Sequence, residues 1–231
     1  MDLLENTQQA LFLLLSADAK LWASIGVSLR VSLTAVLIAA PFGIPAGYLL
    51  HNGRFPGRQV LIVLAQTLLS FPTVVVGLLL YLLLSRGGAF GNLQWLFTQK
   101  AMMLGQFIIA LPMLVTFSYT AVQAVDPAIR EAAASLGAGH VRLMVTTLRA
   151  ARIGIAAALS AAFGRIVSEV GCALMVGGNI AGLTRSIPTA IATETSKGDF
   201  AQGIALGSVL LVLAFGINAG LALTQGYCRR R

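Results

Sequence analysis

Charged side chains are scarce in this sequence. Asp, Glu, Lys and Arg make up only 10% of its 231 residues, while hydrophobic residues make up 57%. A soluble domain carries roughly 25% charged residues, so this composition excludes an ordinary soluble protein. The chain is therefore expected to be an integral membrane protein.

Cysteine and histidine are rare, with two residues of each. The two cysteines provide no disulfide framework, and the histidines have no neighbouring carboxylates or cysteines that would make a metal or nucleophilic site. The glycine spacing of residues 177–184 is similar to that of a phosphate-binding loop, but Leu183 stands where the lysine is required. We expect no catalytic residue, no bound metal and no cofactor on this chain.

Acidic residues are half as numerous as basic ones, which gives a net charge of +8. Nucleic-acid binding is not the expected reason, because the basic residues are dispersed between apolar runs and aromatic residues make up only 7%. They are better explained as membrane topology signals. An internal repeat is also absent from the sequence, which counts against a secondary carrier.

Five segments are apolar and long enough to cross a bilayer, which needs about 20 helical residues. They are residues 24–50, 59–85, 101–125, 153–177 and 200–226. Glycines four residues apart, such as Gly43 and Gly47, predict close contacts between helices in lipid. A shorter apolar run within residues 3–21 predicts an amphipathic helix on the membrane surface. The predicted fold is a single all-α transmembrane domain over residues 1–231.

A polar segment, residues 126–151, separates the third and fourth predicted spans. Asp126 followed by Pro127 is a strong helix start, because the carboxylate caps free N–H groups and the proline ring already has a helical φ. Gly137 and Gly139 predict a break, since glycine adopts the left-handed conformation that ends many helices. The segment, here called the elbow, is therefore predicted to be a helix, a tight turn and a second helix.

Positive charges predict the orientation of the chain. If the elbow is cytoplasmic, nine basic residues lie inside: Arg54, Arg58, Arg130, Arg142, Arg149, Arg152, Arg229, Arg230 and Arg231. Five lie outside: Lys20, Arg86, Lys100, Arg185 and Lys197. The positive-inside rule then places the N-terminus outside and the C-terminus in the cytoplasm.

The elbow contains Glu131-Ala132-Ala133 followed by Gly137, which resembles the EAA signature of the permease subunits of ABC importers. The resemblance runs from about Trp22 to the C-terminus, although the Leu-Pro pair that usually follows in that family is replaced here by Leu148-Arg149. In those permeases the elbow is a cytoplasmic coupling helix that docks on a separate ATPase. The resemblance thus implies a set of coupling residues: Asp126, Glu131, Ala132, Ala133, Gly137, Ala138 and Gly139.

The same resemblance implies the partners. We expect a homodimer in the inner (plasma) membrane of a prokaryote, two ATPase subunits that bind ATP and Mg, and an extracytoplasmic binding protein. The permease itself would perform no covalent chemistry.

Downstream blocks resemble a narrower branch of that family. Ser168-Glu-Val-Gly171, residues 175–180, Thr184-Arg185 and residues 194–200 are similar to tungstate permeases, which are relatives of the molybdate and sulfate permeases. The resemblance implies an oxyanion importer for tungstate. The alternatives are a molybdate or sulfate importer, or a stand-alone ion-coupled carrier or channel that needs no ATPase.

Two charges within the fourth span are candidates for the translocation path. Arg165 and Glu169 are four residues apart, on one helix face, and can form an ion pair. A charge within the bilayer costs about 2.5–3.5 kcal/mol on insertion scales, so both should face protein or water. The pair either holds helices together or acts as a gate for a dianion. Arg30 joins them if its helix face turns inward, and otherwise extends to the interface.

The segment that follows the fourth span is too polar to cross the membrane. Ser186 or Thr189 can cap a short helix there, whose N–H groups would lie near Thr184 and Arg185. These residues, together with Asn179, are candidates for contact with a passing anion. The alternative is a loop that packs over the helices or contacts a binding protein.

We predict that cysteines placed at Asn52 and His140 react only with membrane-permeant thiol reagents in intact cells, whereas a cysteine at Asn92 reacts with impermeant ones. The reason is the excess of positive charge on the elbow side. Labelling of Asn92 only after membrane disruption would reverse the orientation.

Overall fold

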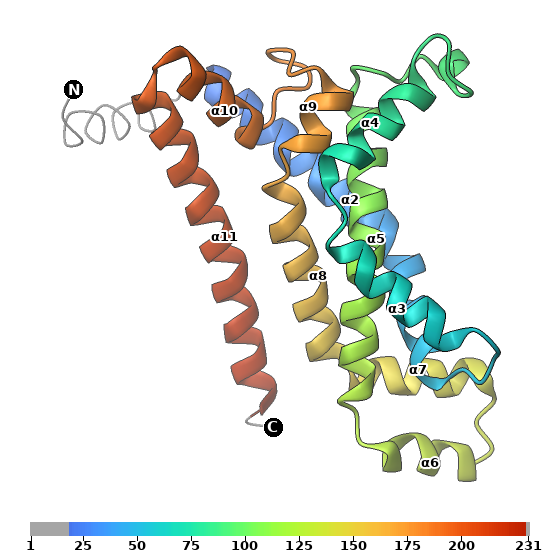
Figure 1. Cartoon of the computed structure of the whole chain (residues 1–231). Helices are drawn as coiled ribbons and strands as arrows, with labels where there is room; N and C mark the ends of the chain where they lie inside the picture. The colour runs from blue at the N-terminus through green and yellow to red at the C-terminus, as the bar shows by residue number, and fades with distance from the viewer. Residues whose placement is uncertain (1–18, 230–231) are drawn as a thin grey trace.

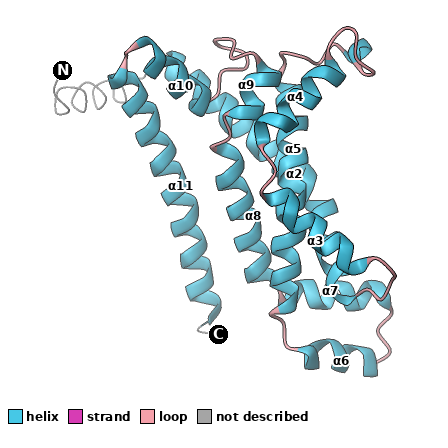
Figure 2. Cartoon of the chain, viewed as in Figure 1, coloured by secondary structure: helices cyan, strands magenta, loops and turns pink. Residues whose placement is uncertain are grey.

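The computed structural model describes residues 19–229, and every regular element in that range is helical. The helices, labelled as in Figure 1, are α2 (Ala19–Asn52), α3 (Arg58–Leu69), α4 (Thr73–Leu84), the 3-10 helix η1 (Gly91–Leu93), α5 (Gln99–Gln123), α6 (Pro127–Ser135), α7 (His140–Ala150), α8 (Arg152–Val167), α9 (Gly171–Gly177), α10 (Ile187–Lys197) and α11 (Phe200–Arg229). Figure 2 shows only loops between them. The predicted all-α fold is confirmed, while nearly all of the amphipathic helix predicted over residues 3–21 lies outside the described residues.

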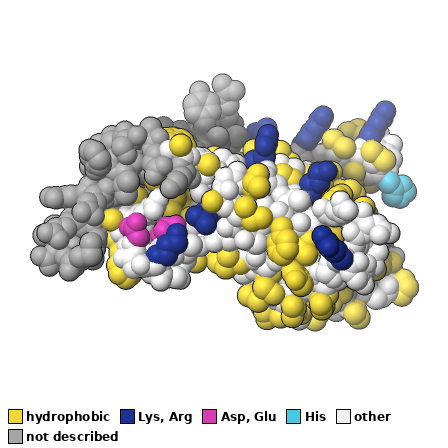
Figure 3. Space-filling model, turned by 90° about the horizontal axis from the view of Figure 1, so that it is seen from above, with side chains coloured by type: hydrophobic (Ala, Val, Ile, Leu, Met, Phe, Trp, Pro, Cys, Tyr) yellow, Lys and Arg dark blue, Asp and Glu magenta, His cyan; other side chains and the backbone are white. Residues whose placement is uncertain are grey.

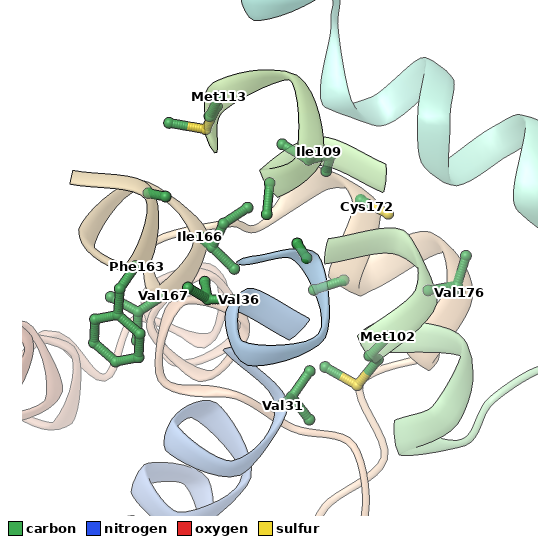
Figure 4. Close-up of a cluster of buried hydrophobic side chains, with 14 of the residues drawn as sticks. Val31, Val36, Met102, Ile109, Met113, Phe163, Ile166, Val167, Cys172 and Val176 are labelled. Atoms are coloured by element: carbon green, nitrogen blue, oxygen red, sulfur yellow. The ribbon is translucent and has the colours of Figure 1, made fainter. Parts of the chain in front are cut away.

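The core of the molecule lies where α2, α5, α8 and α9 meet. Figure 4 shows side chains from these four helices in one cluster, including Val31 from α2, Met102 from α5, Ile166 from α8 and Val176 from α9, each almost fully buried. Helix α11 stands to one side in Figure 1 and packs mainly against α10. The core is thus a bundle around α5, with α11 as an outlying helix.

Glycine brings α2 and α5 together. An added Cβ at Gly43 would lie 2.6 Å from the Cβ of Leu114, and one at Gly47 would lie 2.7 Å from the backbone oxygen of Val115. The two helices therefore touch backbone to backbone, as the spacing of these glycines predicts. Pro41 and Pro45 lie inside α2 without ending it, which helices in membranes tolerate.

Two of the predicted spans are interrupted. Residues 59–85 form α3 and α4, which meet at 96°. Pro72 is the physical reason, because it lacks an N–H and disfavours helical geometry in the preceding residue. The fourth predicted span, residues 153–177, is divided into α8 and α9 by the three residues between Val167 and Gly171.

By length and composition, two helices in the described part of the chain can cross a membrane alone, α2 from Leu21 and α5. Two bent pairs, α3 with α4 (96°) and α7 with α8 (73°), raise the number to four if each pair is one span, and the apolar stretch Phe200–Gly216 of α11 is shorter. This is roughly consistent with the five predicted spans. The elbow and α10 lie at opposite ends of the bundle in Figure 1.

We predict that Gly47→Val destabilises the protein by roughly 1–3 kcal/mol, the usual cost of overpacking. The matched control is Gly26→Val on the same helix, because an added Cβ at Gly26 has nothing within 4 Å. Thermal unfolding in detergent, followed by size-exclusion chromatography, measures both. Equal midpoints for the two variants would contradict the close contact between α2 and α5.

Candidate functional site

The elbow begins as its sequence predicts. Asp126 is the N-cap of α6, its carboxylate accepts a hydrogen bond of 2.9 Å from the N–H of Ala128, and Pro127 occupies the first helical turn. A carboxylate at this position also interacts favourably with the helix dipole. The start of α6 is therefore fixed by local chemistry.

The turn of the elbow depends on Gly137, whose φ is +77°. The N–H of Gly137 donates to the oxygen of Ala134 (3.0 Å), and the N–H of Ala138 donates to that of Ala133 (3.1 Å). This pair of bonds is the Schellman ending, in which a left-handed residue satisfies the last carbonyl groups of a helix. Gly139 has an ordinary φ of −68° and precedes α7.

One side of the elbow is anchored and the other is free. Helix α7 packs on the bundle through the buried Thr147 and the partly buried Met144, in a cluster with Tyr48. Helix α6 has no buried residue, and beyond it Leu136 is 87% exposed. Figure 1 shows α6 at the extreme end of the molecule. The side chains of α6 and Leu136 are therefore accessible from outside the bundle.

Arg165 and Glu169 form the ion pair that their spacing predicts, with 2.8 Å between Nη1 and Oε2. Glu169 is 3% exposed, and its other oxygen, Oε1, accepts a hydrogen bond of 3.2 Å from the N–H of Cys172. Arg165 is 47% exposed and lines a cavity of about 300 Å³ with Thr73, Phe71 and others. The pair thus joins a fixed, buried anion to a cation that reaches an open space.

Arg30 is not part of this pair. Its side chain is exposed on α2, and no ion pair joins it to any residue in the described range 19–229. The structure therefore brings together two of the three intramembrane charges singled out in the sequence.

Three other path candidates, Asn179, Thr184 and Arg185, lie together in the loop between α9 and α10. The Thr184 hydroxyl is buried, donates to the oxygen of Gly177 (2.6 Å) and accepts from the N–H of Ile180 (2.9 Å). Asn179 has a φ of +50° and its Nδ2 donates to the hydroxyl of Thr193. In this conformation these groups stabilise the loop.

Arg185 joins that loop to α10. Its Nη1 lies 3.6 Å from Oε1 of Glu194, which also pairs with Lys197 at 3.0 Å. Figure 3, viewed from above, shows acidic and basic side chains side by side on this face, beside a cavity of about 540 Å³. Buried Asn179 Oδ1 and Arg185 Nε have no protein partner among the described residues.

Sequence reasoning missed Glu194 as a partner of Arg185. The spacing of Glu194 and Lys197 by three residues could have indicated their pair. The approach of Arg185, in contrast, depends on how the loop folds. The cap of α10 was found from sequence, since Thr189 Oγ1 accepts from the N–H of Ser186 at 2.9 Å.

Residues 39–225 match the family described as "Binding-protein-dependent transport system inner membrane component". The chain is 45% identical over 198 residues to a "Probable anion ABC transporter permease protein" of Haloferax volcanii, covering 84% of this chain and 85% of the relative. It is 39% identical over 214 residues to the "Tungstate uptake system permease protein TupB" of Campylobacter jejuni, covering 93% and 90%.

Among solved structures, a bacterial ABC transporter involved in the import of the polysaccharide alginate is similar in fold. The TM-score is 0.72 at 20% identity, and the match covers 91% of this chain and 82% of that one. At this identity the likeness concerns the fold alone.

We predict that Glu169→Leu destabilises the protein more than Glu169→Gln, by roughly 1–3 kcal/mol, the cost of leaving a buried donor unsatisfied. Glutamine removes the charge but keeps an oxygen for the N–H of Cys172, whereas leucine removes both. Thermal unfolding in detergent measures the difference. If the two variants were equally stable, the bond to Cys172 would contribute nothing.

Proposed function

Because this chain belongs to the family of inner-membrane components of binding-protein-dependent transport systems, we propose that it is the permease subunit of an ATP-driven oxyanion importer, and that its oxyanion is tungstate. The proposal of tungstate as the substrate rests on the 39% identity to a tungstate uptake permease over 93% of the chain. The similarity to an anion permease over 84% of the chain agrees with it.

The elbow is the proposed contact with a separate ATPase subunit. Its support is the free surface of α6, where Glu131 and Ala132 are exposed and Leu136 stands almost fully in solvent. ATP and Mg would bind that partner, because the sequence of this chain has no phosphate-binding lysine in its glycine-spaced loop. The coupling residues proposed from sequence keep that role: Asp126, Glu131, Ala132, Ala133, Gly137, Ala138 and Gly139.

A homodimer with two ATPases is the proposed assembly. One chain leaves Arg165 half exposed beside an open cavity, and a charge within the bilayer must face protein or water. A second copy would enclose the path between the two chains. The proposed path residues are Arg30, Arg165, Glu169, Asn179, Thr184 and Arg185.

In the proposed orientation the elbow is cytoplasmic and α10 faces the outside, in the inner membrane of a prokaryote. Its support is the charge bias of nine basic residues against five. Figure 1 places the end of α11 toward the elbow and the start of α2 toward α10, so the N-terminus would be outside. An extracytoplasmic binding protein would deliver the anion to the face that carries α10.

Coupling then follows from the stiffness of the elbow. Asp126 and Gly137 fix the two ends of α6, and α7 connects it directly to α8, which carries Arg165. When ATP binding draws the two ATPases together, each α6 would move as a rigid body and shift α8. The path would open toward the outside, and hydrolysis would reset it.

We predict that Gly137→Val abolishes uptake, while Gly57→Val, in the loop before α3, reduces it far less. Both glycines are left-handed, with φ of +77° and +82°, and an added Cβ meets nothing within 4 Å at either position, so the two variants differ in location and not in backbone strain. A left-handed φ costs a non-glycine residue about 1–2 kcal/mol, and the cost is higher for a β-branched residue such as valine. Uptake and association with the ATPase are measured for both, and normal uptake by Gly137→Val would contradict the coupling role.

We predict that the complete importer takes up tungstate in preference to molybdate and far ahead of sulfate, and that Arg185→Ala slows uptake without reversing this order. All three are tetrahedral dianions, so a brief contact in the path gives little discrimination and the binding protein should determine selectivity. Uptake by reconstituted vesicles tests both statements. Sulfate uptake equal to that of tungstate would overturn the tungstate assignment.

A further inference from the structure

The two helix breaks lie side by side. Residues 70–72 separate α3 from α4, and residues 168–170 separate α8 from α9. Gly171, directly after the second break, contacts the start of α4: an added Cβ would lie 2.6 Å from Cγ2 of Val74 and 3.4 Å from Oγ1 of Thr73. Figure 1 shows both breaks between the elbow end and the α10 end of the bundle. Both interruptions therefore lie within the depth of the membrane.

Lipid is an unfavourable environment for the two helix breaks. Non-helical backbone at membrane depth is tolerated only where protein or water covers it. Ser70, Phe71 and Pro72 are nevertheless exposed in the single chain, and so is Ser168 at the second break. Arg165, one turn before Ser168, is 47% exposed at the same place. We define Ser70, Thr73, Arg165 and Ser168 as the break face.

Other exposed surfaces of the bundle have a different chemistry. On α2, Leu37 is 60% exposed, and on α11 Leu211 and Phe215 are 71% and 73% exposed. These apolar side chains suit contact with lipid. The break face also has exposed apolar neighbours, Phe71 and Val74 at 41% and 52%. Its cation, hydroxyl groups and interrupted backbone nevertheless require a neighbour other than lipid.

We propose that the break face is one half of a contact site for tetrahedral dianions, completed by the break face of a second copy of this chain across a two-fold axis. The inference rests on the proposed function, and it adds a location and the residues Ser70, Thr73 and Ser168. The partner copy contributes its own Arg165, so the site is incomplete in one chain.

The bonding of Arg165 explains how such a site releases its ion. The guanidinium group has five N–H donors, and its one contact with Glu169 leaves others directed to the cavity. Glu169 is buried and held by the N–H of Cys172, so it stays with the arginine and neutralises most of its charge. A passing dianion would meet two partly compensated cations and the hydroxyl groups of Ser70 and Thr73, while the Ser168 hydroxyl donates to the backbone oxygens of Gly164 (3.2 Å) and Arg165 (3.0 Å). Such a site binds briefly, as a transport path requires.

Cysteine accessibility tests the location. In a background with Cys172→Ala and Cys228→Ser, Ser70→Cys and Ser168→Cys are reconstituted as the full complex with ATPase and binding protein. A charged, water-soluble methanethiosulfonate reagent should modify both, and tungstate should slow the reaction during turnover. Leu37→Cys, which is also exposed but lies among apolar side chains, is the control and should not react. The proposal is wrong if the complex transports tungstate but neither test cysteine reacts, as is expected of Leu37→Cys. The break face would then face lipid.

Charge removal tests the chemistry. Arg165→Gln alone leaves Glu169 buried and unpaired and can fail to fold, so the informative variant is Arg165→Gln with Glu169→Gln. Loss of a charged contact should reduce tungstate uptake at least about tenfold, with assembly of the complex unchanged. Uptake within twofold of the parent would overturn the site. If the parent complex did not take up tungstate, the proposed function would be wrong. The location of the break face would still be tested in that case, because reagent access to Ser168→Cys does not depend on the anion.

Discussion

The backbone contact between α2 and α5 is the constraint on which the rest of the structure depends. In lipid, burial of apolar side chains gives helices little reason to associate, so close van der Waals contact must hold them together. Gly43 and Gly47 supply that contact. Helix α5 is then surrounded by α3, α4, α8 and α9, and the elbow follows directly from its end.

Other small residues allow similarly close helix contacts around α5. Gly154 of α8 faces Ala121, and Gly105 of α5 faces the sulfur of Cys172. Close packing therefore holds α8 and α9 in position, with Arg165 near the end of α8 and Glu169 in the break between the two helices. The geometry of the charged pair depends on contacts made by residues with almost no side chain.

Local signals made the elbow and the charged pair predictable. Asp126, Pro127 and Gly137 act on their immediate neighbours, and the Arg165–Glu169 pair joins residues only four apart, although Glu169 lies beyond the end of α8 at Val167. The interruption after α8 was not predicted, because no proline marks residues 168–170 and the long apolar run around them reads as one span. The contact of Arg185 with Glu194 depends on the fold of a loop, which periodicity does not encode. Pro72 explains the break between α3 and α4, but the angle of 96° between the two helices is known only from the structure.

The exposed elbow affects the newly made chain before it binds its partners. A newly inserted copy carries Leu136, 87% exposed, just after α6, and Val141, 70% exposed, in the first turn of α7. Apolar groups of this kind are what chaperones and proteases recognise in incomplete complexes. We expect the cell to keep this chain only in proportion to its ATPase, so that synthesis of one subunit would regulate the abundance of the other.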